Sequence, residues 1–253
     1  MVTNPDLIFT PGWRHVYDRF IKEAYTNARG FKEAIGFSYS FNPRMYHCMS
    51  TNTSLFELRK AAAMYFWYKH ADQSDLSIIE YFDEYKRCID EKNNKFNSNY
   101  GYYAYTLGGL KSCIKKLADN PYTRHAMFCI NNMYAMSDAS IDKLCTNAIH
   151  FFIKNKMLFM VVQMRSSNFI TLLPYDAFMF SVFYAHVYNG IRRKINDLAI
   201  GNIKMQVASL HFHANDICKI KQTEEIDGNI IGDMANNNWC IFLEDKLLKA
   251  IQK

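Results

Sequence analysis

The chain has 253 residues, 49% of them hydrophobic, which is enough for a sizeable core in one domain spanning 1–253. Its 30 Lys and Arg against 24 Asp and Glu give a net charge of +6, but the basic residues are scattered, which favours small anionic ligands over nucleic acid as partners. The seven cysteines form no C-x-x-C pair, the start lacks a signal-peptide pattern, and no run approaches the roughly 18 apolar residues of a membrane span. We therefore expect a cytoplasmic protein without membrane contact.

In the first half of the chain, apolar residues at helical spacing predict helices over 12–28, 53–70 and 76–92. The segment AAAMYFWYK within 53–70 is apolar almost all round and is expected to be buried, whereas 76–92 is amphipathic. The polar run EKNNKFNSN that follows is expected to be a loop.

In the second half, a helix over 104–118 is expected to end before the break at Asn120-Pro121. Aromatic and β-branched runs predict strands, and Lys154-Asn155-Lys156 is expected to join two of them as a hairpin. The strands cover 125–131, 147–153, 157–164 and 203–212, and a long apolar helix covers 174–194. Helices and strands in this mixture predict an α/β fold.

Cys145 lies just before the predicted hairpin and has two interpretations. Free cysteine is among the most buried residue types, which favours an inert thiol. Arg165 and Ser166, however, end the second strand of the hairpin, where the arginine can approach the sulfur and favour the thiolate, whose free pKa is about 8.5. The same guanidinium can hold a phosphate with two hydrogen bonds. These residues alone leave open whether Cys145 is inert or is a nucleophile beside an anion site.

His211 and His213 are two residues apart on a predicted strand, so both rings should lie on one face. A metal site is one interpretation, but no third ligand follows at a recognisable spacing, and we expect no metal.

Seven short motifs occur in the order and spacing of the thymidylate synthase family. They are NSNYG (97–101), NPYTRHAM (120–127), MSD (136–138), CTN (145–147), QMRSSN (163–168), LPYDA (173–177) and SLHFH (209–213). The chain resembles this family over about 97–216 and more thinly over 29–72. Since CTN stands where an ordinary synthase has Pro-Cys-His, the resemblance is greater to the phage deoxycytidylate hydroxymethylases. It implies a thymidylate synthase-like α/β (α+β) fold, with a mixed sheet flanked by helices and a homodimer packed sheet to sheet with shared active sites.

The resemblance also implies a reaction. Cys145 would add to carbon 6 of a pyrimidine deoxynucleoside monophosphate, and carbon 5 would then attack the one-carbon group of 5,10-methylenetetrahydrofolate, used as a co-substrate. Capture by water gives 5-hydroxymethyl-dCMP. The alternatives are a methylating enzyme acting on dCMP or dUMP, a dUMP hydroxymethylase and, from another class, a nucleotide- or RNA-binding pseudoenzyme.

Further roles come from the same resemblance. Arg165 would contact both phosphate and thiolate, and Ser166 would bind the phosphate. Arg124 would reach the phosphate bound to the other subunit, and Tyr100 would line the site beside Cys145.

Three further positions concern the sugar and the cofactor. His211 would contact a ribose hydroxyl, and His213 replaces a tyrosine in that role. Asn168 stands where an aspartate commonly contacts the pterin, so the use of folate is less firmly implied than the use of a nucleotide.

Asp176 falls where uracil-specific members of the family have an asparagine. A carboxylate can accept hydrogen bonds from the amino group at carbon 4 of cytosine and from a protonated ring nitrogen, so this residue favours deoxycytidylate. Asp176 is then catalytic together with Cys145, Tyr100 and Arg165. The alternative is a helix N-cap just after Pro174.

Met64 counts against the reaction, because it stands where the family has a glutamate that organises water and relays protons. Glu57, two helical turns earlier, is expected to be too distant. A composition rich in Lys, Asn and Tyr suits an AT-rich phage genome, and we expect the protein to act in the host cytoplasm of a phage-infected bacterium.

Overall fold

The architecture is a six-stranded mixed sheet flanked by helices, which confirms the predicted α/β class. The structure, a computed structural model, describes residues 11–45, 57–89, 94–132, 136, 141–219 and 238–252. The strands are β1 (Tyr25–Thr26), β2 (Phe31–Phe41), β3 (Met127–Cys129), β4 (Thr146–Lys154), β5 (Met157–Asn168) and β6 (Ala199–His213). Their order is β1-β2-β6-β5-β4-β3, and only β5 and β6 are parallel neighbours.

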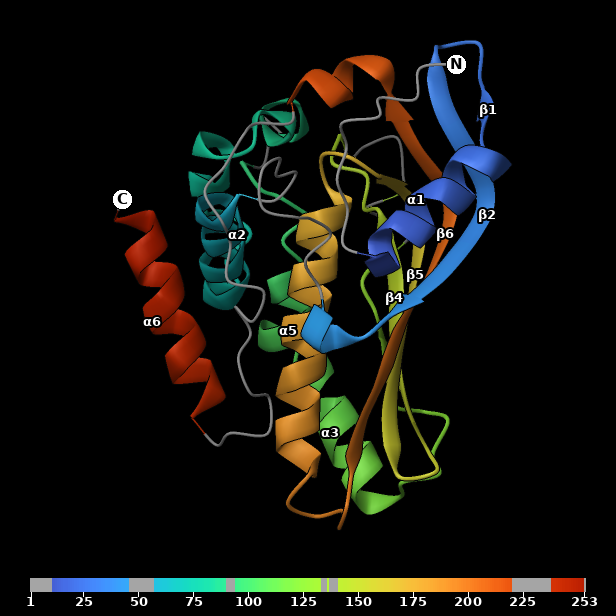
Figure 1. The fold of residues 1–253 in the computed structure, drawn as a ribbon. Coiled ribbons are helices and arrows are strands. Elements are labelled where there is room, and N and C mark those ends of the chain that lie inside the picture. Colours follow the sequence, from blue (N-terminus) through green and yellow to red (C-terminus); the bar gives the residue numbers. More distant parts are fainter. Residues whose placement is uncertain are drawn as a thin grey trace.

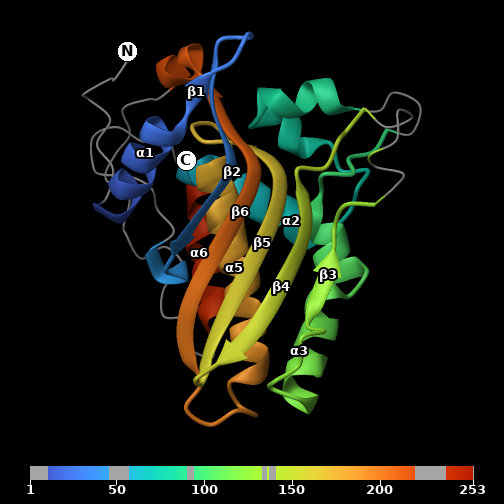
Figure 2. The same ribbon diagram turned by 90° about the vertical axis from the view of Figure 1, so that its right-hand side faces the viewer.

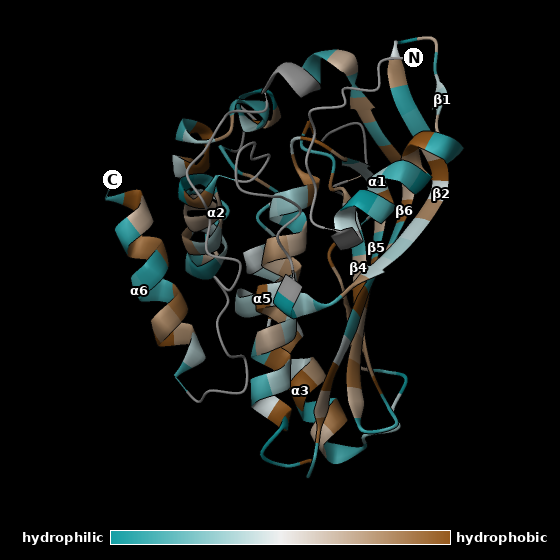
Figure 3. Cartoon of the chain, viewed as in Figure 1, coloured by the Kyte–Doolittle hydropathy of each residue, from teal (hydrophilic) through white to brown (hydrophobic). Residues whose placement is uncertain are grey.

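The helices form layers on one side of this sheet (Figure 1). They are α1 (Pro11–Glu23), α2 (Leu58–His70), α3 (Gly109–Asp119), α5 (Leu173–Ile191) and α6 (Trp239–Ile251). α5 lies against the sheet, α2 packs on α5, and α6 packs on α2. Because α5 is enclosed from both sides, it is buried along nearly its whole length. Along α6, by contrast, hydrophobic and hydrophilic residues alternate, as expected for an outer helix (Figure 3).

The other face of the sheet is open. In the part of the chain that the structure describes, no helix packs on the face turned toward the viewer in Figure 2. Along β5 the buried residues alternate with partly exposed ones, among them Phe159 and Val161, which lie on this open face. A sheet face can be covered by water alone, but apolar side chains exposed together on such a face are typical of a surface that packs against another molecule.

In three neighbouring strands, the alternation of buried and exposed side chains shifts by one residue at the same level of the sheet. We call this irregularity the kink. On either side of it, successive buried residues are three apart instead of two: Ala34 and Phe37 in β2, Val207 and Leu210 in β6, and Met164 and Ser167 in β5. These positions are paired across the strands, so the alternation of buried and exposed side chains shifts at the same level in all three strands. Gly36, with φ 67°, takes the left-handed conformation that the kink requires in β2. In β5 the kink falls on Arg165 and Ser166, leaving two consecutive side chains only partly buried.

The hairpin predicted around residue 155 is confirmed. β4 pairs with β5 from Thr146 to Lys154, and the two-residue turn Asn155-Lys156 has positive φ at both positions, 50° and 58°. This is the turn geometry that matches the twist of two antiparallel strands.

Two predicted helices differ from the structure. The helix over 76–92 is wrong, because its described part forms two short 3₁₀ helices, Ser77–Glu80 and Asp83–Cys88. The backbone of Phe82 between them is extended, with φ −129° and ψ 101°, which prevents a continuous helix. The helix over 104–118 is divided into a π-helical turn, Tyr102–Thr106, and α3, because Gly108 between them is left-handed at φ 72°.

The prediction also missed two whole elements and the end of one helix. β2 and α6 were not predicted, and α1 ends at Glu23 instead of 28 because the chain enters β1. β2 owes its conformation to pairing with β6, more than 160 residues away, and such non-local pairing leaves little trace in local sequence. Residues 53–56 of the second predicted helix lie outside the described residues.

Candidate active site

A cavity of about 770 Å³ lies where β5 and β6 end and where β2 and β4 begin. This volume is within the usual range for small-molecule sites, and the carboxyl ends of parallel strands are a common place for them. Eight of the nine predicted site residues line it: Tyr100, Cys145, Arg165, Ser166, Asn168, Asp176, His211 and His213. The ninth, Arg124, does not.

Cys145 directly precedes β4, beside the end of β5. Its Sγ is 3.7 Å from Arg165 Nη2 and 3.7 Å from Ser166 Oγ, so the predicted approach of the arginine is observed. Burial raises the pKa of the Cys145 thiol and outweighs the lowering by Arg165 and Ser166; Asp176 and Asp142 raise it further. The structure therefore favours the thiol, and a bound ligand or a proton acceptor has to promote the thiolate.

Arg165 also holds the peptide that carries the cysteine. Its Nε donates to Leu144 O and its Nη2 to Lys143 O, both at 2.7 Å, while its backbone N–H donates to Cys145 O at 2.8 Å. Nη1 donates to Ser166 Oγ at 3.0 Å, so the guanidinium and the hydroxyl present one polar surface to the cavity. Together they can bind an anion next to the sulfur.

Asp176 lies in the first turn of α5 and faces the same cavity. The alternative role as an N-cap is wrong, because the N-cap residue is Leu172 and Asp176 N–H makes a regular helical bond to Leu172 O at 2.9 Å. The carboxylate instead accepts a hydrogen bond from Ser167 Oγ at 3.2 Å. Burial raises the pKa of Asp176 to about 7, so near neutral pH this group can either accept or donate a proton.

Tyr100 reaches the backbone beside the nucleophile. Its hydroxyl accepts a hydrogen bond from the Thr146 N–H at 3.2 Å, one residue after Cys145. Burial, followed by the nearby Cys145 and Asp176, raises the pKa of Tyr100 well above its usual value. The phenol is therefore neutral and can donate its proton in a hydrogen bond.

The two histidines lie on one face of β6, as expected from their spacing. The Phe31 ring packs edge-on against both, with centroid distances of 5.5 Å to His211 and 5.2 Å to His213. Among the residues that the structure describes, no cluster of three His, Cys, Asp or Glu side chains is arranged to hold a metal.

The Asn168 side chain stabilises the turn between β5 and α5. Its Nδ2 donates to Asp216 Oδ2 at 2.8 Å, and its Oδ1 accepts from the N–H groups of Ile170 and Thr171 at 2.9 and 3.0 Å. These bonds explain the residue structurally, and a contact with a pterin stays a prediction.

Arg124, Met64 and Glu57 lie away from the cavity. Arg124 is exposed on the loop after α3, where its carbonyl oxygen is 2.8 Å from His150 Nε2. Met64 is buried within α2 at 1% exposure, and Glu57 pairs with Lys60 at 2.9 Å. No side chain of α2, which is described in full, lines the cavity.

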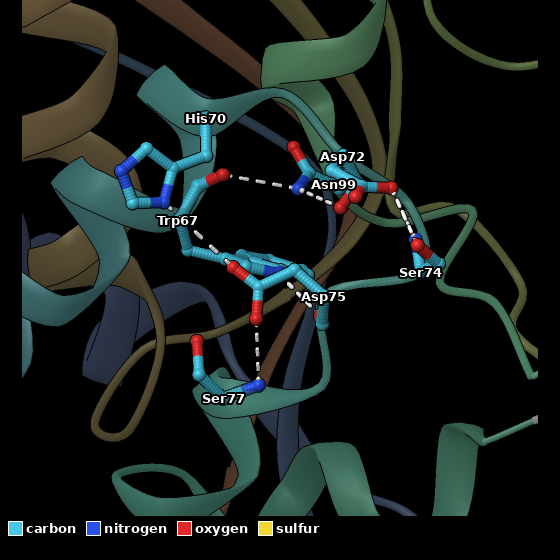
Figure 4. Close-up of polar contacts among 7 residues, drawn as sticks. All are labelled: Trp67, His70, Asp72, Ser74, Asp75, Ser77 and Asn99. Carbon is cyan, nitrogen blue, oxygen red and sulfur yellow. Dashed lines mark hydrogen bonds and ion pairs between the residues drawn. The ribbon is translucent and has the colours of Figure 1, made fainter.

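The NSNYG motif is explained by the segments that it joins. Asn99 Nδ2 donates to Trp67 O and to Asp72 O, both at 3.1 Å, which satisfies carbonyl groups at the end of α2 (Figure 4). Gly101 packs directly on this helix, since a Cβ there would lie 1.8 Å from Tyr68 O. The motif therefore fastens the Tyr100 segment to α2. Most of the MSD motif lies outside the described residues.

No protein-family model matches this chain, and no curated protein does. None of the helices that the structure describes is both long and apolar enough to cross a membrane.

Sequence reasoning missed two buried acids in the cavity, Asp142 and Asp216, the second of which is 7% exposed. Asp142 is 3% exposed, and its Oδ2 accepts hydrogen bonds from Ser98 N–H at 2.7 Å and Ser98 Oγ at 2.8 Å. Burial raises its pKa, while the bonds to Ser98 and Asn97 and the Arg165 charge lower it. The available signal was its place three residues before Cys145, which by itself does not distinguish it from a surface aspartate.

Proposed function

We propose that the protein belongs to the thymidylate synthase family and acts in the cytoplasm on carbon 5 of a pyrimidine mononucleotide, hydroxymethylating dCMP with 5,10-methylenetetrahydrofolate. The observation that carries this proposal is the cavity in which Cys145 Sγ lies 3.7 Å from the Arg165 guanidinium, with Ser166 and Asp176 on the same walls. A sulfur nucleophile, an anion site and a base-recognition carboxylate are the groups that this reaction requires.

Recognition of the nucleotide follows from these positions. Arg165 and Ser166 hold the phosphate, and Asp176 faces the pyrimidine. With its pKa near 7, Asp176 can donate to the ring nitrogen of cytosine and accept from the exocyclic amino group. His211 and His213, held beside Phe31, face the sugar.

The covalent step is an addition. Cys145 loses its proton to water and forms a bond from sulfur to carbon 6, while the ring nitrogen takes a proton from Asp176 and carbon 5 becomes nucleophilic. Methylenetetrahydrofolate supplies one carbon at the oxidation level of formaldehyde. Overall, dCMP, methylenetetrahydrofolate and water give 5-hydroxymethyl-dCMP and tetrahydrofolate, with no net oxidation, and Cys145 is released.

The cavity extends beyond the nucleotide groups. Tyr85 supplies an aromatic surface there, and Arg87, Asn168 and Asp216 supply polar atoms, so these walls suit a flat ring with hydrogen-bonding edges. This chemistry fits the cofactor, which would bind between these walls and the pyrimidine.

We also propose a homodimer that packs through the open face of the sheet and shares its sites. Partly exposed Phe152, Phe159 and Val161 on this face support it, as does Ile35, which is 66% exposed. Arg124 is exposed on the loop after α3, where a second subunit can reach it.

The competing proposal is a binding protein without turnover. It is supported by Met64, which supplies no proton relay, and by the raised pKa of the Cys145 thiol. Methylation of dCMP or dUMP is a second alternative within the same chemistry.

The decisive experiment incubates the protein with dCMP or dUMP and methylenetetrahydrofolate. Product masses are measured while dihydrofolate absorbance is followed, with Cys145→Ser as the control. We expect a hydroxymethyl mass gain on dCMP without dihydrofolate, and none with Cys145→Ser. A methyl gain with dihydrofolate would replace hydroxymethylation by methylation. Absence of any product, with RNA bound at physiological salt, would favour the binding protein.

A further inference from the structure

Three consecutive residues of the NSNYG motif contact three different parts of the chain. Asn99 is tied to the end of α2 through Trp67 O and Asp72 O (Figure 4). Ser98 binds Asp142, and Tyr100 binds the Thr146 N–H. A turn anchored on a helix therefore holds the segment 142–146 at two points.

The nucleophile lies between these two points. Cys145 follows Asp142 by three residues and precedes Thr146 directly. From the other side, Arg165 holds Lys143 O and Leu144 O. Hydrogen bonds thus hold the loop from β5 on one side and from the NSNYG motif on the other. Among the bonds described, the bond between the Asp142 carboxylate of the loop and Ser98 is the one charged attachment to the motif.

Several titratable groups act on the Cys145 thiol from the surrounding elements. They are Arg165 of β5, Asp176 of α5 and Asp142 of the loop, while the thiol in turn raises the pKa values of the neighbouring Tyr85, Cys88 and Tyr100. The guanidinium favours the thiolate, and the two carboxylates oppose it. Asp142 is the carboxylate among these that is also bound to the backbone of the motif, through Ser98 N–H.

We propose that Asp142 is a positioning residue for Cys145, which fixes the nucleophile loop through Ser98 and balances the charge of Arg165 beside the sulfur. The inference rests on the proposed function in that Cys145 is the nucleophile. Its effect on the thiol can nevertheless be measured without any substrate.

The first test is the pH dependence of Cys145 alkylation by iodoacetamide, followed by mass spectrometry of the peptide that contains Cys145. Asp142→Asn keeps an oxygen that can accept from Ser98 but removes the charge. We expect the midpoint pH of alkylation to fall by about one unit, because a negative charge near the thiolate is lost. The matched control is Asp119→Asn, which removes an exposed carboxylate paired with Lys115 on α3 and should leave the midpoint unchanged.

The second test addresses the attachment through Ser98. Ser98→Ala removes the hydroxyl bond, and we expect kcat for dCMP to fall about tenfold with KM changed less than twofold, since a misplaced nucleophile affects the chemical step. Ser98→Thr keeps a hydroxyl and should restore most of kcat. Thermal melting of each variant confirms that it folds.

The outcomes separate the two proposals. A midpoint in Asp142→Asn that matches the Asp119→Asn control overturns the charge role. Wild-type kcat in Ser98→Ala overturns the role of the Ser98 hydroxyl bond in positioning Cys145. If the wild-type protein has no activity with dCMP or dUMP while the midpoint shifts as expected, the proposed function fails and the effect of Asp142 on Cys145 stands.

Discussion

Asp176 is the residue that we propose recognises the base in the cavity. Its carboxyl group is held by one hydrogen bond, from Ser167 Oγ, and its pKa of about 7 allows it to pair with cytosine as donor and acceptor. An amide at this position presents a fixed donor instead, which matches a carbonyl at carbon 4. Under the proposed function, we therefore expect base preference to depend on one side chain at the start of α5.

Asp176→Asn should reverse the base preference. We expect kcat/KM for dCMP to fall by at least tenfold relative to dUMP, because each buried polar group left unpaired costs about 1–3 kcal/mol. Steady-state kinetics with both nucleotides measures the ratio, and Asp119→Asn serves as the control. An unchanged ratio would show that another group reads the base.

The same substitution should alter stability in a pH-dependent way. The pKa of Asp176 in the folded protein, about 7, exceeds its ordinary value of 3.8. The protonated carboxyl group therefore contributes to wild-type stability in full below pH 4, and this contribution is lost as pH rises to 7. Asp176→Asn does not titrate, so its free energy of unfolding relative to wild type should rise over this range, by at most about 4 kcal/mol. Urea unfolding at pH 4.5 and pH 8 tests this, and an equal difference at both pH values would contradict it.

The site residues that could be predicted from the sequence are those with a reactive or charged group inside a recognisable short motif. Cys145, Arg165, Ser166 and Asp176 belong to short motifs with reactive or charged groups, and all line one cavity. Asp142 could not be predicted, because its importance comes from burial and from bonds to Ser98, 44 residues away, and neither property is visible in its neighbours.

Among the elements, the hairpin was predictable and β2 was not. The turn Asn155-Lys156 and the strands around it are local in sequence. β2 is interrupted by Gly36 and is completed by pairing with β6, so its local pattern is weak. The false helix over 76–92 has a suitable hydrophobic period, but the extended backbone of Phe82 divides its described part into two short 3₁₀ helices.

The junction between α2 and the NSNYG motif depends on the absence of a side chain. In Gly101→Ala the new Cβ would lie 1.8 Å from Tyr68 O, so the helix and the motif would have to separate. We expect a loss of more than about 3 kcal/mol in the free energy of unfolding, or no folded protein, by analogy with severe overpacking.

Gly36→Ala provides the matched comparison. Gly36 has φ 67°, and a methyl group added there would meet no atom within 4 Å, so the substitution should cost only about 1–2 kcal/mol of backbone strain. Urea unfolding compares the two variants. Similar losses for both would mean that contact with α2 is not what requires glycine at position 101.

At the scale of the whole molecule, shared sites can be tested by mixing inactive subunits. Arg124→Ala and Cys145→Ser should each be inactive alone. If Arg124 reaches the other subunit's site, a mixed dimer places both substitutions in one site and leaves the second site intact. Mixing by mild denaturation and refolding should restore about a quarter of wild-type activity if subunits combine at random. No recovery despite dimer formation would place Arg124 outside the reaction.

A charge on the open face of the sheet should prevent that assembly. Val161→Glu places a carboxylate among partly exposed apolar residues of β5, and burying it against a second sheet would be costly. We expect a monomer by sedimentation, with circular dichroism unchanged. Ile241→Glu, which replaces a 66% exposed apolar residue of α6 on the helical side of the sheet, is the control. A dimeric Val161→Glu would exclude this face as the interface.

The kink shared by β2, β6 and β5 has a consequence for how this chain can vary. In these three strands the alternation of buried and exposed side chains shifts at the same level. A residue inserted or deleted on either side of that level in one strand would therefore turn the buried side chains of that part of the strand to the wrong face, relative to the neighbouring strands. The misalignment would reach Arg165 and Ser166, which occupy the bend in β5. Length changes should therefore be tolerated in the loops but excluded from these three strands, even at positions distant from the cavity.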